Sequence, residues 1–161
     1  MMKKYINIII LLLLISITSC KANKPKLNLD DLYGKLYYDE CIYLSPYISD
    51  ITIAEETANH KGISRFDITE NSFYYYETSS PEASMTLRMV TYQEKDVNDN
   101  LTINNDVKDI LKNMTTRYDI YRNNTFQCYS FLYDGKDIYY METRRLVDNT
   151  NYDIWKIVRL K

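Results

Sequence analysis

Runs of strand-forming residues, rich in tyrosine and separated by short polar turns, recur along most of this 161-residue chain. The chain contains 17 tyrosines, and its densest aromatic run is Phe73 to Tyr76. Aromatic and β-branched residues favour strands, whereas the intervening Asn, Asp and Ser residues favour turns. A chain of this length suits one domain of ordinary size. The sequence therefore predicts a single, mainly β domain.

The alternation of apolar and polar residues predicts about eight strands, joined mostly by hairpin turns. Hairpins make neighbouring strands antiparallel, so we expect one antiparallel meander sheet. Closing such a sheet into a small barrel would remove its unpaired edges. The predicted strands span residues 32–44, 63–69, 72–78, 85–95, 116–122, 126–133, 137–147 and 152–160.

Two segments change from the period of a strand to the period of a helix. Residues 47–61 predict a short helix that Ser49 or Asp50 would cap. Residues 105–114 predict a second short amphipathic helix, because apolar residues recur there at three- and four-residue steps.

Two finer expectations concern the last strands. Asp134 and Gly135 lie between two apolar runs and predict a hairpin with a type I′ turn. In the final strand, Ile154 and Val158 share the more apolar face. We therefore expect this face to point into the core and Trp155 to pack on the outer face or under a helix.

One short motif adds a family resemblance to this pattern. The run from Leu32 through Gly34 to Leu36, followed by a helical turn and a meander, is similar to the start of small bacterial lipocalin-like domains. Leu36 occupies the position where that family usually has tryptophan. The resemblance implies a small antiparallel barrel, and a barrel of about eight strands is wide enough to hold one small ligand.

The N-terminal residues predict export and attachment to lipid. Residues 1–19 have two lysines followed by a short apolar run, as in a signal peptide, and the run is too short to span a membrane. The motif from Ile17 to Cys20 resembles the lipobox of bacterial lipoproteins, in which the cysteine receives a diacylglycerol group. We therefore expect a lipidated Cys20, a tether over residues 20–28 and a domain over residues 29–161.

The lipobox also predicts the location and partners of the chain. The mature protein would be anchored to the bacterial cell envelope, and Lys21 favours the outer membrane if the cell has two membranes. The net charge of −2 argues against a nucleic-acid partner, because such proteins usually carry a basic surplus on one face.

Cys41 and Cys128 are the two remaining cysteines of the chain. Disulfides persist in exported proteins, so these residues could form one bridge. They could equally be two buried thiols that pack as small apolar side chains, since the sequence does not set the distance between them. Both alternatives stay open at this point.

The sequence contains no recognisable catalytic constellation. His60 is the only histidine and lies at a polar helix end, where a solvated or capping role is expected. Neither a metal site nor a cofactor site is expected, and the three glycines are too dispersed to form a phosphate-binding loop.

Two functions are compatible with these features. The first is a non-enzymatic, lipid-anchored envelope protein that binds a small apolar or amphipathic ligand. The alternative is an interaction or scaffold lipoprotein, whose open sheet contacts a protein partner and contains no ligand cavity. A hollow or filled interior would distinguish the two.

Overall fold

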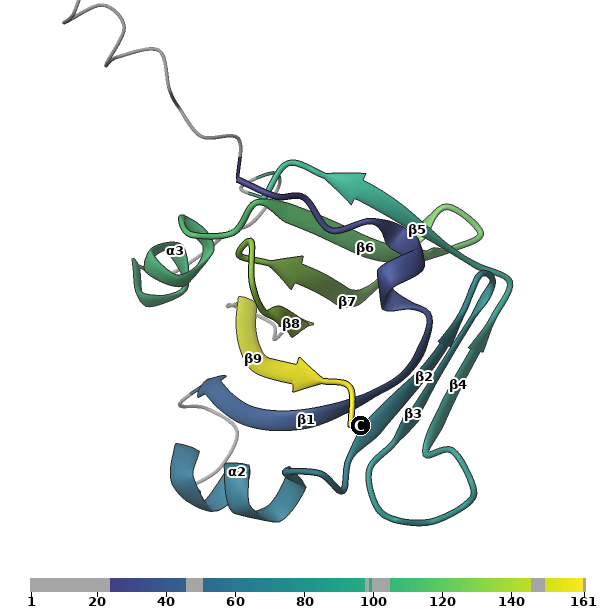
Figure 1. The fold of residues 1–161 in the computed structure, drawn as a ribbon, viewed down its shortest axis with the longest axis vertical. Coiled ribbons are helices and arrows are strands. Elements are labelled where there is room, and N and C mark those ends of the chain that lie inside the picture. Colours follow the sequence, from purple (N-terminus) through teal and green to yellow (C-terminus); the bar gives the residue numbers. More distant parts are fainter. Residues whose placement is uncertain (1–23, 46–50, 98, 100–104, 146–149, 161) are drawn as a thin grey trace, which may run out of the picture.

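Nine antiparallel strands form one strongly curved sheet in the computed structural model, which describes residues 24–45, 51–97, 99, 105–145 and 150–160 (Figure 1). The spatial order of the strands is β4-β3-β2-β1-β9-β8-β7-β6-β5. Their bounds are β1 Gly34–Tyr43, β2 Arg65–Thr69, β3 Ser72–Tyr76, β4 Met85–Arg88, β5 Val90–Lys95, β6 Thr116–Arg122, β7 Thr125–Tyr133, β8 Ile138–Arg145 and β9 Thr150–Val158.

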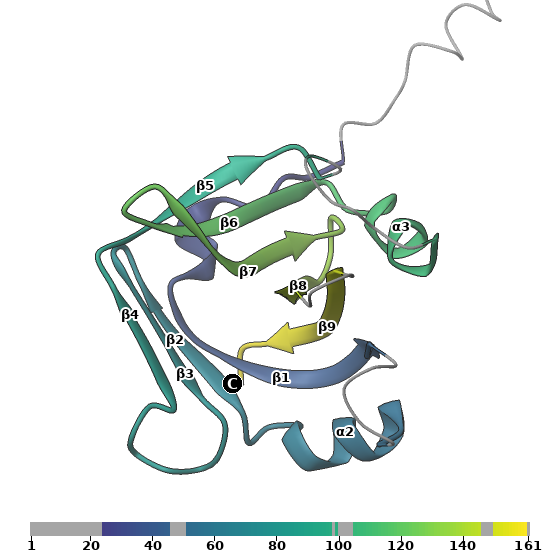
Figure 2. The ribbon, with the colours of Figure 1, turned by 180° about the vertical axis from the view of Figure 1, so that it is seen from behind.

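The two edge strands of this sheet, β4 and β5, are consecutive in the chain. Met89 lies between them with a φ of 57°, and the backbone N–H of Val90 donates to the carbonyl of Asn71 at 3.0 Å. The chain therefore bends at Met89 and brings the two edges toward each other. The result is a nearly closed small barrel of the lipocalin-like kind, which confirms the predicted fold class (Figure 2).

The bend at Met89 also explains why nine strands form where about eight were predicted. The predicted strand 85–95 is two strands, because β4 pairs with β3 whereas β5 pairs with β6 at the other edge. The positive φ of Met89 interrupts the alternation at one residue. A pattern of apolar and polar residues does not reveal such a single-residue bend.

Two α-helices and one 3-10 turn accompany the sheet: α2 Ile53–His60, α3 Asn105–Leu111 and η1 Leu29–Leu32. Both predicted helices are confirmed. The cap of α2 is Thr52, whose hydroxyl accepts from the N–H of Glu55 at 3.2 Å while the Glu55 carboxylate accepts from the N–H of Thr52 at 2.9 Å. This capping box replaces the expected cap at Ser49 or Asp50, two residues outside the described ranges.

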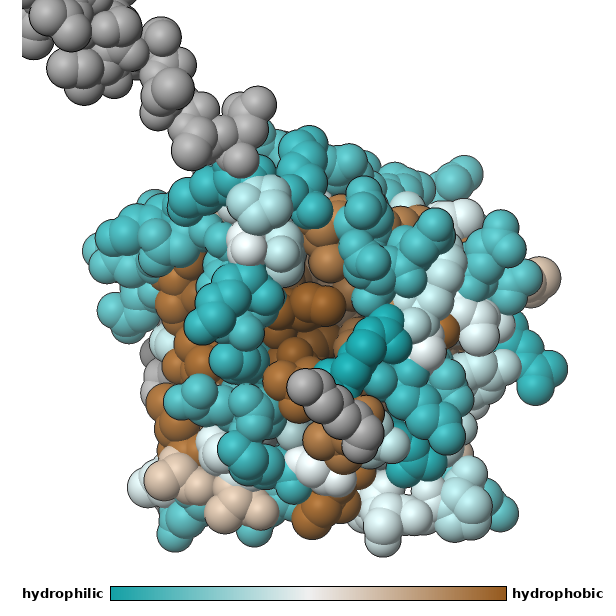
Figure 3. Space-filling model, viewed as in Figure 1, coloured by the Kyte–Doolittle hydropathy of each residue, from teal (hydrophilic) through white to brown (hydrophobic). Residues whose placement is uncertain are grey.

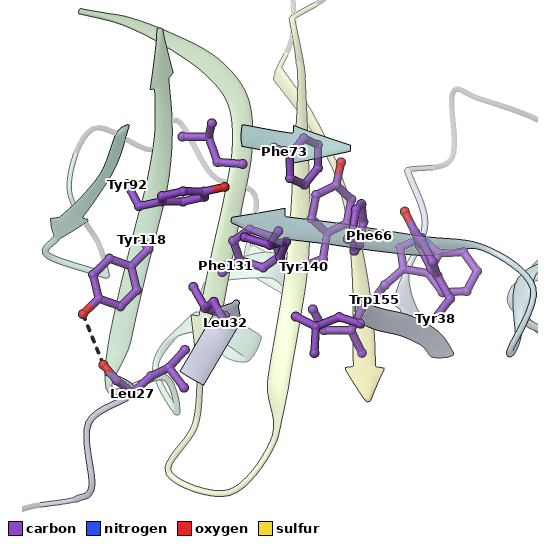
Figure 4. Packing of buried hydrophobic residues seen from close by; sticks show 14 of the residues in the cluster. Leu27, Leu32, Tyr38, Phe66, Phe73, Tyr92, Tyr118, Phe131, Tyr140 and Trp155 are labelled. Carbon is purple, nitrogen blue, oxygen red and sulfur yellow. Dashed lines mark hydrogen bonds between the residues drawn. The ribbon is translucent and has the colours of Figure 1, made fainter. Parts of the chain in front are cut away.

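Aromatic side chains fill the inside of the barrel (Figure 4). Phe66 is fully buried and its ring centroid lies 4.4 Å from that of Tyr140 and 5.2 Å from that of Phe73. On the face shown in Figure 3, apolar side chains gather at the centre and hydrophilic ones surround them. We call the buried residues that fill the inside of the barrel the interior cluster. Its largest members are Tyr38, Phe66, Phe73, Tyr92, Tyr118, Phe131, Tyr140 and Trp155.

A second cluster lies between the sheet and α3, and we call it the outer cluster. It consists of Val107, Leu111, Leu132, Met141, Tyr152 and Ile154. The sheet is therefore buried on both faces where α3 covers it.

This double burial reverses the predicted orientation of β9. Ile154 belongs to the outer cluster, whereas Trp155 and Ile157 belong to the interior cluster. The prediction that Ile154 points into the barrel and Trp155 away from it was wrong. An apolar face marks the inside of a sheet only where the other face is solvated, and α3 removes that condition here.

The packed part of the chain begins before Leu29, the predicted start of the domain. Leu27 is buried, its N–H donates to Thr116 Oγ1 at 3.1 Å, and its carbonyl accepts from the Tyr118 hydroxyl at 3.2 Å (Figure 4). The carbonyl of Pro25 accepts from Thr115 Oγ1 at 2.9 Å. Residues 25–28 therefore lie on the barrel and do not form part of a tether.

The hairpin at Asp134 is present, but its turn type differs from the prediction. Tyr133 pairs with Ile138, so the loop has four residues, and the Asp134 carboxylate accepts from the N–H groups of Lys136 and Asp137, both at 2.8 Å. These bonds contribute to a lowered pKa of Asp134. The turn with two positive φ angles, as type I′ requires, is at Asn123 and Asn124 between β6 and β7.

Cys41 and Cys128 are thiols in the structure. Cys41 lies on β1 and Cys128 on β7, and two strands, β9 and β8, separate them along the sheet. Neighbouring strands are about 4.8 Å apart, so the separation along the sheet is roughly twice the longest Cα distance that a disulfide spans. Of the two alternatives, a disulfide or two thiols, the structure contains the two thiols. Cys41 is buried and Cys128 is half-buried.

We expect Cys41 to resist alkylation in the native protein. Burial is the main cause that raises its pKa to about 12, and the charge of Asp153 adds to it. Only the thiolate reacts, so iodoacetamide at pH 8 should modify Cys41 roughly a hundredfold or more slowly than in denaturant. A Cys128→Ser variant isolates the Cys41 signal in peptide mass spectrometry. Equal native and denatured rates would contradict the burial of this thiol.

Candidate functional site

A hollow of about 120 Å³ lies at one end of the barrel, and we call it the distal hollow. Side chains from β1, α2, β3, β8 and β9, and from the residues that follow β1 and β3, converge on it. The lining residues are Tyr38, Leu44, Glu56, His60, Tyr75, Glu77, Glu142, Arg144, Asp153 and Trp155.

The chain enters the barrel at the opposite end from the distal hollow. Pro25 lies beside Gly135 in the loop before β8, whereas Glu142 and Arg144 are near the end of β8. Arg144 lies six positions after Ile138 along the strand, a rise of about 20 Å. Figure 1 shows the same arrangement, with the N-terminal segment at the top and α2 at the bottom.

The apolar side of the distal hollow is aromatic. The ring centroids of Tyr38 and Trp155 are 4.5 Å apart in an edge-to-face arrangement, and the His60 ring lies 5.6 Å from that of Trp155. Tyr75 packs on Tyr38 at 6.1 Å. These rings join the distal hollow to the interior cluster. Trp155 is the only tryptophan of the chain, so its fluorescence reports on this site alone.

The polar side is a compact ion-pair network. Arg144 Nε lies 3.2 Å from Glu142 Oε1, and Arg144 Nη2 lies 3.1 Å from Asp153 Oδ2. The other oxygen of Asp153 accepts from the N–H of Ser45 at 3.0 Å. Burial raises the pKa of both Glu142 and Asp153, while Arg144 opposes that shift. The charged forms of both carboxyls therefore depend on a cation beside them.

His60 ends α2, as the sequence predicts, but its side chain is part of this site, so the expectation that it is solvated was wrong. Its Nε2 lies 3.3 Å from Glu56 Oε1, and its Nδ1 lies 2.7 Å from Ser64 Oγ. The side chain is only 21% exposed. A local helix pattern does not show that the helix end packs on Trp155, which follows it by 95 positions.

Glu56, His60 and Ser64 have the residue types of a hydrolytic triad, but their hydrogen bonds run in an unsuitable direction. Ser64 Oγ donates to the carbonyl of Glu77 at 2.6 Å, so it accepts from His60. A nucleophilic serine would instead donate its proton to the histidine. Ser64 is also fully buried, which keeps a substrate carbonyl away from its hydroxyl. The three residues therefore tie α2 to β3.

The lining of the distal hollow has an excess of negative charge. Four carboxyl groups, those of Glu56, Glu77, Glu142 and Asp153, face Arg144 and His60. Within the part of the chain that the structure describes, no group of three or more His, Cys, Asp or Glu side chains is arranged to hold a metal ion. The arrangement is suited to binding an organic molecule with an apolar and a polar part.

The residues predicted as sites lie elsewhere in the molecule. Cys20 is outside the described residues, Cys41 is buried in the interior cluster and Cys128 lies on β7. The sequence did contain one unused signal for the distal hollow. Glu142 and Arg144 continue the inward face of β8 after Tyr140, and charged residues that extend an aromatic face mark the end of a core.

No protein-family model matches this chain, and no curated protein or solved structure is significantly similar to it. The helices in the described residues are all too short or too polar to cross a membrane.

Proposed function

We propose that this protein is a lipid-anchored, non-enzymatic component of the bacterial cell envelope that binds a small amphipathic molecule in the distal hollow. The observation that carries the proposal is the lining of that hollow, with aromatic rings on one side and an ion-pair network on the other. A purely apolar ligand would remove the charged groups of Glu142, Arg144 and Asp153 from water without offering them a hydrogen bond, so the amphipathic alternative is favoured.

The position of the hollow supports this proposal. Cys20 precedes Pro25 by five residues, which span at most about 18 Å. A lipid on Cys20 would thus hold the end of the barrel near Pro25 close to the membrane, while the distal hollow opens at the other end. A water-borne ligand would then reach the hollow without competition from the lipid surface. In a cell with two membranes, Lys21 favours the outer one.

The interior cluster fills the centre of the barrel, which by itself favours the scaffold alternative, but the distal hollow remains at one end. The edges of the sheet give the scaffold alternative less support. A sheet that binds a protein partner by its edge needs a long exposed strand, but the edge strands β4 and β5 have four and six residues and curl toward each other.

Titration of the full-length lipoprotein in phosphatidylcholine nanodiscs tests the proposal. The probes are benzylammonium, benzyl alcohol and benzoate, which share one shape and differ in charge. At least one of them should shift the emission of Trp155 saturably and raise the melting temperature. Leu44→Phe narrows the hollow and should weaken that binding by roughly tenfold, a loss typical of one misfitted contact.

Leu160→Phe is the matched control, because it makes the same change at an exposed residue near the C-terminus. Its affinity should equal that of the wild type. If all three probes leave both the emission and the melting temperature unchanged, the distal hollow is not a binding site and the proposed function is wrong.

A further inference from the structure

We infer that the distal hollow selects a small organic cation, with an ammonium or guanidinium group on a short apolar body. This inference rests on the proposed function and names the chemical class of its ligand.

The charge of the lining favours a cation over an anion. Even when His60 is protonated, four carboxyl groups face at most two cationic side chains, so the lining stays negative. An anionic ligand would have to displace Glu142 and Asp153 from Arg144 and leave two buried carboxylates unpaired. A cation avoids that cost.

Arg144 shows what kind of group these carboxylates hold. Its guanidinium lies between Glu142 and Asp153 with three N–O distances from 3.1 to 3.3 Å. Asp153 is almost fully buried and is held from its other side by the N–H of Ser45. The side chain of Arg144 is itself 42% exposed, so it can move outward and admit a ligand cation beside the same two carboxylates.

The aromatic rings supply the second half of the recognition. Tyr38, Tyr75 and Trp155 line the hollow beside the carboxylates. Faces of tyrosine and tryptophan attract organic cations, and the attraction increases when the site excludes water. Carboxylates and rings together therefore bind an organic cation better than a hydrated metal ion, for which they supply no rigid set of ligands.

The three probes also test this inference. Benzylammonium should bind the full-length protein in nanodiscs about tenfold more tightly than benzyl alcohol, and benzoate should be the weakest. Glu142→Gln keeps the shape of the side chain and removes its charge. It should therefore weaken the binding of benzylammonium by roughly tenfold and leave the affinity for benzyl alcohol unchanged. Glu70→Gln is the matched control, since Glu70 is an exposed residue in the β2–β3 turn.

The possible results separate the two proposals. Equal affinity for benzylammonium and benzyl alcohol would overturn the cation preference but leave a binding site in the hollow. If Glu142→Gln and Glu70→Gln reduce the affinity for benzylammonium equally, the effect comes from net charge, and selection of a cation by the carboxylates of the hollow is overturned. Tighter binding of benzoate would reverse the inferred ligand class. A lack of binding by every probe would reject the hollow itself.

Discussion

Ile154→Asp is expected to unfold the domain. Ile154 is fully buried in the outer cluster, where Leu132 and Met141 of the sheet meet α3. A carboxylate there would have no cation partner, and burying an unpaired charge costs several kcal/mol. The free energy of unfolding of a typical domain is only about 5 to 15 kcal/mol. Circular dichroism and urea melts should therefore show a largely unfolded or strongly destabilised variant.

Lys156→Asp, two residues further along β9, provides the comparison. The Lys156 side chain is partly exposed and its ammonium group lies 3.2 Å from Asp137 Oδ2. The substitution removes this surface ion pair and places two carboxylates near each other, which should cost about 1 kcal/mol. Similar and small losses in both variants would mean that α3 does not cover this part of the sheet.

The strands near the C-terminus could be predicted within one or two residues because their signals are local. Apolar alternation and flanking turns define β6 to β9 without reference to the rest of the molecule. The face that points inward is not a local property. On β1, irregularities in the pairing with β9 fall between Tyr38 and Glu40 and between Cys41 and Tyr43. Tyr38 and Cys41 therefore share the interior although strict alternation puts them on opposite faces.

Glu142 and Arg144 could have marked one wall of the distal hollow, but the hollow as a whole could not be predicted because its parts are far apart in the sequence. Glu56 and His60 come from α2, whereas Glu142 and Asp153 come from the last two strands. Each residue alone has an ordinary local explanation, such as a helix end or a polar strand position. Only the order of strands, which places β9 beside both β1 and β8, brings these groups to one end of the barrel.

Cys20→Ala is expected to release the protein from the membrane completely. The proposed anchor is a set of acyl chains on Cys20, and each buried methylene contributes about 0.8 kcal/mol, so two or three chains make attachment effectively permanent. In the described residues, most large apolar side chains face inward or pack under α3, and the exposed exceptions are Ile51, Ile53, Ile63, Met89 and Leu160. The barrel itself therefore offers little that would hold it on a bilayer. Cell fractionation of the variant should move the protein from the membrane to the soluble fraction.

Cys41→Ala is the control for the loss of a thiol, and it should remain in the membrane fraction. The Cys20→Ala protein should still be folded, because the contacts of the described residues with the rest of the domain start at Lys24 and Pro25. Its melting temperature and its affinity for the benzyl probes should therefore equal those of the wild type. A Cys20→Ala chain that stays in the membrane fraction and is processed normally would contradict the lipoprotein assignment. A released chain that has lost its fold would instead show that residues before Lys24 belong to the barrel.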